Sequence, residues 1–142
     1  MQSDELESKF VAILNKKIPV GHLMNVLGHM AAGIVVSYSN ISEMRFDSYI
    51  DQSGGIHKSI SDYPFIILSA DNSNQLRILR KELTGAGVCF VDFTNTMTVG
   101  TYLEQKEKTK TTPEDQLEYY GVCIFGNKDI ISPITKKFSL WK

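Results

Sequence analysis

The sequence lacks the features that mark several classes of protein. Its 142 residues include only two cysteines and four prolines, which excludes a disulfide scaffold and a proline-rich extended chain. Lys and Arg number 15 against 16 Asp and Glu, so the excess of positive charge typical of nucleic-acid binding is absent. The longest apolar run, residues 24–36, is interrupted by His29 and is shorter than the roughly 20 residues that cross a bilayer. We therefore expect neither a nucleic-acid nor a membrane partner.

The remaining composition is typical of a single globular domain. Hydrophobic residues make up 42% and charged residues 22% of the chain, enough to form a core without disulfides. The first ten residues, MQSDELESKF, contain no signal-peptide core, which favours a cytoplasmic protein. Cys89 and Cys123 lie in apolar segments without a basic neighbour, as reduced thiols buried in strands do. We expect a flexible leader over residues 1–8 and one domain over residues 9–142.

Apolar periodicity predicts an alternation of strands and helices. Continuous apolar runs typical of buried strands occupy four segments, and 3.6-residue spacing or capping residues indicate helices between them. Residues 45–63 contain a Ser-Gly-Gly turn and predict a hairpin or an excursion. This order predicts an α/β fold with a mixed, largely parallel sheet of four strands flanked by helices. The expected strands are residues 9–15, 64–70, 88–93 and 119–125, and the expected helices are residues 19–37, 74–86, a charged segment within 97–110, and 127–132.

The first expected helix, residues 19–37, is apolar almost all the way round. Such a helix normally packs on more than one side. A narrow polar seam runs along it, because His22, Asn25 and His29 fall close to one line at 3.6 residues per turn and Gly33 continues that line. Imidazoles and an amide on an apolar helix need hydrogen-bond partners or a wet cleft.

A second group of polar residues follows the third expected strand. It consists of Asp92, Thr94, Asn95 and Thr96. The carboxyl ends of parallel strands form the edge where ligand crevices occur in open α/β sheets, so this group and the polar seam would meet there. A carboxylate beside an imidazole would make a general base. The alternative is structural, because Asp and Thr after a strand often cap the next turn.

The sequence argues against a metal ion and a cofactor. His22 and His29 are seven residues apart, about 10 Å along a helix axis at 1.5 Å per residue, which is too far to share one zinc ion. No phosphate-binding glycine motif, nucleophile elbow or CxxC pair occurs in the chain. The charged segment 104–110 is typical of a solvated helix face, or of a lid over the cleft.

Four segments in this order resemble type 2 peptidyl-tRNA hydrolases, and more closely an uncharacterised domain-of-unknown-function family with that fold. The segments are FVAILN, PVGHLMNVLGHMAAG, FVDFTNT and YYGVCIFGNKDIISPITKKFSLW. The hydrolase motif of glycine, lysine and, seven positions later, histidine falls on Gly21, His22 and His29, so histidine replaces the lysine. The resemblance implies that His29, Asp92 and Thr96 line the active cleft and that the protein is a homodimer.

Three functions remain open from the sequence. The first is a hydrolase of a small or peptidyl ester or amide, with His29, Asp92, Thr96 and His22 as catalytic residues. The second is a binding module, for a small molecule or a protein, that kept the cleft without the lysine. The third is a structural or dimeric interaction protein in which the polar seam is buried at an interface. The residues expected to contact a substrate are Asn25, Gly21, Thr94 and Asn95, joined by His57 if the fold returns its segment to the cleft.

Overall fold

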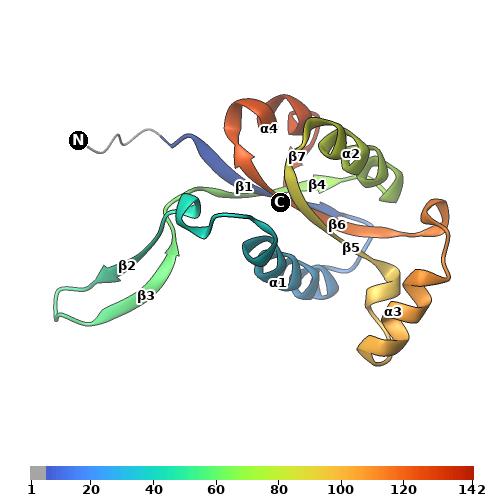
Figure 1. Cartoon of the computed structure of the whole chain (residues 1–142), viewed down its shortest axis with the longest axis horizontal. Helices are drawn as coiled ribbons and strands as arrows, with labels where there is room; N and C mark the ends of the chain where they lie inside the picture. Colours follow the sequence, from blue (N-terminus) through green and yellow to red (C-terminus); the bar gives the residue numbers. More distant parts are fainter. Residues whose placement is uncertain (1–5) are drawn as a thin grey trace.

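The computed structural model describes residues 6–142, and Figure 1 shows the arrangement of its elements. The helices are α1 (Val20–Ser37), α2 (Ser73–Ala86), α3 (Tyr102–Lys110) and α4 (Lys128–Thr135). Short 3-10 turns are η1 (Ile41–Met44), η2 (Asn95–Met97) and η3 (Glu114–Gln116). The strands are β1 (Ser8–Asn15), β2 (Phe46–Ile50), β3 (Ile56–Ser61), β4 (Phe65–Ala70), β5 (Cys89–Thr94), β6 (Tyr119–Asn127) and β7 (Ser139–Leu140). The leader expected over residues 1–8 lies largely outside the described residues, and Ser8 belongs to β1.

The main sheet has the strand order β5-β6-β1-β4-β7. The predicted α/β domain with a mixed sheet is confirmed, but the prediction of four largely parallel strands is wrong. β7 adds a fifth strand at the edge, and β1 with β4 is the one parallel pair among the described neighbours. β6 returns between β5 and β1 in the opposite direction, a placement that apolar periodicity does not encode because it reports burial and not strand order.

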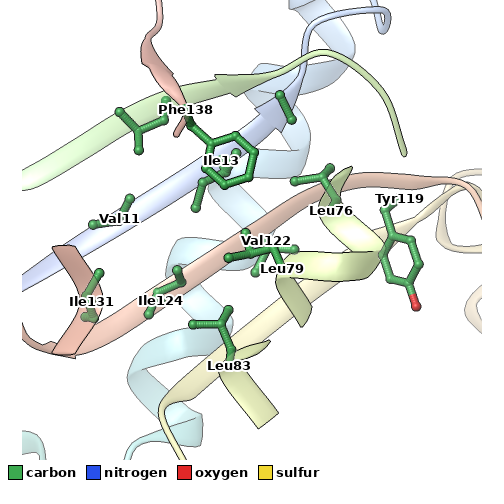
Figure 2. Close-up of a cluster of buried hydrophobic side chains, with 12 residues drawn as sticks. Val11, Ile13, Leu76, Leu79, Leu83, Tyr119, Val122, Ile124, Ile131 and Phe138 are labelled. Carbon is green, nitrogen blue, oxygen red and sulfur yellow. The ribbon is translucent and has the colours of Figure 1, made fainter. Parts of the chain in front are cut away.

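Strand alternation divides the core between the two faces of the sheet. In β1, Val11 and Ile13 join the cluster beneath α2 and α4, whereas Ala12 and Leu14 join the cluster beneath α1. Figure 2 shows the first cluster, in which Leu76, Leu79 and Leu83 of α2 point onto the sheet. We call these two sides the α2 face and the α1 face.

The sequence accounts for the position of α2. Asn72 caps its first turn, because the Asn72 side chain accepts a hydrogen bond from the Gln75 backbone N–H at 3.0 Å. Gly87 ends the helix in the left-handed region with φ of 67°, where a residue without a Cβ is favoured. The expected helix over residues 74–86 is therefore confirmed to within one residue.

The α1 helix packs on one side only. Leu23, Val26, Met30 and Ile34 are buried against the sheet, and β6 has Gly121 where a Cβ would lie 2.7 Å from the terminal methyl of Met30. The expectation that α1 is covered on more than one side is wrong for the described chain. Its outer face leaves three large apolar side chains exposed, namely Val20 (59%), Met24 (69%) and Val36 (88%).

By length and composition α1 is long and apolar enough to cross a membrane, although only 22% of it is buried here. The sequence expectation concerned the shorter run 24–36 within this helix. A core helix of a soluble protein passes the same test, and the buried side of α1 packs on the sheet. The length and composition of α1 are therefore weak evidence on whether this helix crosses a membrane.

The excursion over residues 45–63 is a hairpin, as its turn residues predict. β2 and β3 pair in antiparallel register, and Gly54 has φ of 84° in the turn between them. The hairpin projects from the body of the molecule on the side away from α3 (Figure 1). Its residues therefore do not contribute to the sheet edge that carries α3.

Candidate functional site

Polar residues of α1 and the segment after β5 do meet at one edge of the sheet. β1 and β5 both run antiparallel to β6, so their carboxyl ends lie at the same edge. α1 follows β1, and η2 and α3 follow β5. A groove separates α1 from η2 and α3, and we call it the α1–α3 groove. Four residues border both of its ends: His29, Phe93, Met97 and Gln105.

The groove has two ends of different chemistry. The lysine end has a volume of about 680 Å³, and the additional residues that line it are Met30, Gly33, Val91, Asp92, Tyr102, Lys106, Thr109 and Lys110. The histidine end has a volume of about 570 Å³, and its additional residues are Gly21, His22, Asn25, Val26, Thr98, Val99 and Tyr120. One end therefore combines an apolar floor with lysines, and the other carries imidazole and amide groups.

The polar seam of α1 faces this groove. His22, Asn25 and His29 are exposed, and the ring centroid of His29 lies 5.9 Å from that of Phe93. Within residues 6–142, none of the three side chains hydrogen-bonds to another protein group. The sequence left open whether these side chains have hydrogen-bond partners within the protein or face a solvent-filled cleft. The structure shows that they face the groove.

Asp92 does not orient either imidazole. Although Asp92 borders the lysine end, its carboxylate accepts a hydrogen bond from Arg80 Nε of α2 at 2.9 Å. Val91 and Phe93 pack with the α1 cluster, so alternation along β5 directs the Asp92 side chain to the α2 face. The predicted pairing of Asp92 with His29 is therefore wrong. The Asp92 carboxylate in turn raises the pKa of Arg80.

The three predicted site residues that follow Phe93, namely Thr94, Asn95 and Thr96, are held in internal hydrogen bonds. The Thr94 and Thr96 hydroxyls are buried and lie 2.7 Å apart, and Thr109 of α3 donates to Thr96 Oγ1 at 2.7 Å. Asn95 accepts a hydrogen bond from the Glu118 backbone N–H at 3.0 Å. Thr96 is thus a link that fastens α3 to the sheet, and the expectation that it faces the cleft is wrong because α3 covers it.

Two other expected substrate contacts, Gly21 and His57, lie in different parts of the molecule. Gly21 lies at the histidine end of the groove, as expected. His57 lies on β3, where its Nε2 is 2.8 Å from Asp51 Oδ2 and its hydrogen bond lowers the pKa of Asp51. The hairpin projects away from α3, so His57 does not reach the groove (Figure 1). The expected role of His57 at the site is therefore wrong.

Neither cysteine lines the groove, and the described residues form no cluster that could hold a metal ion. Cys89 and Cys123 are free thiols on β5 and β6, as expected. Burial raises the pKa of Cys123 to about 12 and also raises the pKa of Cys89, so neither is an activated nucleophile. Over residues 6–142, no three His, Cys, Asp or Glu side chains are close enough to hold one metal ion.

Sequence reasoning missed the wall of the groove opposite α1. Gln105, Lys106, Thr109 and Lys110 line it from α3, a segment interpreted mainly as a solvated helix face. Their spacings of three, four and five residues place them on one side of a helix, and this pattern was available in the sequence. The pattern did not reveal which surface α3 faces, because α3 has no buried residue that would indicate packing against another element.

The comparisons with known proteins agree with this fold. No curated protein matches the chain. A solved structure, that of the protein of unknown function Atu0240 from Agrobacterium tumefaciens strain C58, has a TM-score of 0.82 over 97% of this chain and 100% of its own, with 19% identity. At that identity the likeness concerns the fold alone. A family model matches residues 8–142. The chain therefore belongs to the family described as protein of unknown function DUF2000.

Proposed function

We propose that this chain is a small-molecule-binding domain whose ligand lies in the α1–α3 groove. The observation that carries the proposal is the set of polar side chains on α1, His22, Asn25 and His29, which line an open groove without a protein partner in the described residues. An amide and two imidazoles supply both donors and acceptors to a ligand. Largely apolar concave surfaces with a few polar groups are the usual form of small-molecule sites.

The contacts of the remaining residues favour binding over hydrolysis. A histidine general base is normally oriented by a second group, and a developing oxyanion needs donors aimed at it. The carboxylate of Asp92 pairs with Arg80, and the hydroxyl of Thr96 is buried beneath α3. His29 therefore lacks the orienting acid that the hydrolase hypothesis assigned to it, and of the two oxyanion donors in that hypothesis, Thr96 and Asn25, only Asn25 lines the groove.

A fragment screen by ligand-observed NMR, followed by protein-observed NMR of the histidine imidazoles, tests the proposal. We expect a set of fragments that bind the wild-type protein, shift the imidazole resonances of His22 and His29, and lose binding in His29→Ala. The matched control is His57→Ala, because this imidazole lies on the hairpin outside the groove. Fragments that bind equally well to both variants would contradict the proposal. Release of a cleaved product would replace it with the hydrolase hypothesis.

We also propose that the fold is that of type 2 peptidyl-tRNA hydrolases. Its support is the order of the four resembling segments, with His29 on the helix after β1 and Asp92 on β5. The replacement of lysine by His22 and the engagement of Asp92 lead us to expect no cleavage of peptidyl-tRNA. Incubation with a labelled peptidyl-tRNA measures this directly, and turnover would show that the substitution is tolerated.

A cytoplasmic location and homodimer formation are still predictions, and the second can be tested on the exposed side of α1. The uncovered apolar side of α1, which includes Val20, Met24 and Val36, would offer a second copy a surface without any charged residue. Light scattering of the wild-type protein and of Met24→Asp measures the mass in solution. We expect a dimer that the aspartate converts to a monomer, and a wild-type monomer would remove the prediction.

A further inference from the structure

The lysine end of the α1–α3 groove carries two cations on one side of α3. Lys106 and Lys110 are four residues apart and border the same hollow, as residues on one helix face do. Lys108 lies on the other side of α3, where it borders a separate shallow hollow with Glu104 and Glu107. The lysines of α3 therefore divide into two that face the groove and one that faces acidic neighbours.

No carboxylate neutralises the two groove lysines. Over residues 6–142, neither Lys106 nor Lys110 forms an ion pair, and the one acidic residue at this end, Asp92, pairs with Arg80 on the α2 face. The Lys106 ammonium lies 5.2 Å from the centroid of the Tyr102 ring, a cation–π contact that holds the charge at the groove wall. The lysine end is therefore a site of uncompensated positive charge.

Beside these charges the floor of the groove is apolar. Met30, Val91, Phe93 and Met97 line it, and Gly33 adds no side chain to fill it. An apolar body that enters this hollow is removed from water, which favours binding. The two methionines adapt to different shapes because their side chains are unbranched and flexible.

The helix dipole is a structural reason for lysines at the end of α3, but it does not explain all three of them. Cations in the last turn of a helix interact favourably with its dipole, which accounts for Lys108 and Lys110. Lys106 precedes the last turn of α3, so the helix dipole does not account for it, and it borders the apolar hollow. The same dipole disfavours high negative charge at this helix end, so the site suits one negative charge better than a polyphosphate.

On the basis of the proposed binding function, we infer that the ligand is a monocarboxylate with an apolar body. Its carboxylate pairs with Lys106 and Lys110, and its apolar body lies on the floor formed by Val91, Phe93 and Met97. The imidazole of His22 and the amide of Asn25 at the histidine end would contact any substituent that extends past His29.

Octanoate and octanol test the inference, because they share an apolar chain and differ in charge. Titration calorimetry of the full chain measures both affinities, with Lys106→Gln/Lys110→Gln as the test variant and Lys108→Gln as the matched control. We expect octanoate to bind about tenfold more tightly than octanol, and we expect the double variant to lose this preference. The Lys108→Gln control keeps it. All three lysines are exposed, so the variants are expected to fold.

Three results would overturn the inference. They are equal affinities for octanoate and octanol, an unchanged preference in the double variant, and tighter binding of octyl phosphate than of octanoate. If such a result occurs while fragments still bind in a His29-dependent manner, the ligand class is wrong and the proposed binding function stands. If neither octanoate nor any fragment binds in the groove, both fail.

Discussion

The two faces of the sheet treat their polar groups in opposite ways. On the α2 face, charges are paired: Arg77 with Glu114 at 2.9 Å, Arg80 with Asp92 at 2.9 Å, and Lys137 with Glu82 at 2.8 Å. On the α1 face, His22, Asn25 and His29 have no hydrogen-bond or ion-pair partner among the described residues, and α1 has no side-chain cap.

This difference separates the two roles of the fold. Groups that pair with one another stabilise the folded chain, whereas unpaired groups beside an open groove are available to another molecule. Both faces have a buried apolar core, so we assign stabilisation by paired charges to the α2 face and recognition to the groove side of α1. The predictions below test this assignment by substitutions on either side.

The largest expected effect is on the stability of the α2 face. Leu79 is fully buried in the cluster of Figure 2, so Leu79→Ala should lower the free energy of unfolding by about 3 kcal/mol through lost burial and a cavity. Asn25→Ala on the groove side of α1, where the side chain is exposed, should change it by less than about 0.5 kcal/mol. Urea denaturation followed by circular dichroism measures both values. Similar losses for the two variants would remove the contrast.

Asp92→Asn should weaken the protein without affecting recognition. The variant loses the charge in the pair with Arg80, which is partly exposed, and we expect a loss of about 1 kcal/mol. Octanoate affinity should stay within about twofold of wild type, because the carboxylate points to the α2 face. Denaturation and calorimetry on the same sample check both. Abolished ligand binding with unchanged stability would restore Asp92 as a site residue.

A smaller effect concerns acid stability. The hydrogen bond from Arg77 lowers the pKa of Glu114, so this pair adds stability above the ordinary glutamate pKa and the stability is lost as pH falls through the lowered value. The Glu114 side chain is 44% exposed, and the contribution is therefore under about 1 kcal/mol. Arg77→Gln should flatten the fall in stability with acid below about pH 5. An unchanged slope would contradict the pairing.

The smallest stability effect is expected at the groove itself. His29 is exposed and has no hydrogen bond within the described chain, so His29→Ala should change the free energy of unfolding by less than about 0.5 kcal/mol. The same variant should lose the fragment binding described above. A thermal or urea midpoint that falls as far as that of Leu79→Ala would show that His29 supports the fold instead.

Much of the fold could be predicted from the sequence, and less of the site. The apolar run that forms β1, the leucines of α2 and the Ser-Gly-Gly turn before β3 each report local burial or backbone conformation, and each prediction was confirmed. The pairing of Asp92 could not be predicted in this way. Its partner Arg80 lies 12 residues away on another element. Whether the Asp92 side chain meets α1 or α2 depends on the face of β5 to which that side chain points.

The sequence by itself determined most of the elements and the polar seam of α1, because helix and strand periods are local properties of the chain. It did not determine β7 or the uncovered side of α1. Only the tertiary structure decided the neighbours. It placed β6 between β5 and β1, set α3 over Thr96, and opened a groove between His29 and Lys106. The physical reason is that the contact between two surfaces depends on how the whole chain packs, and neither surface contains that information alone.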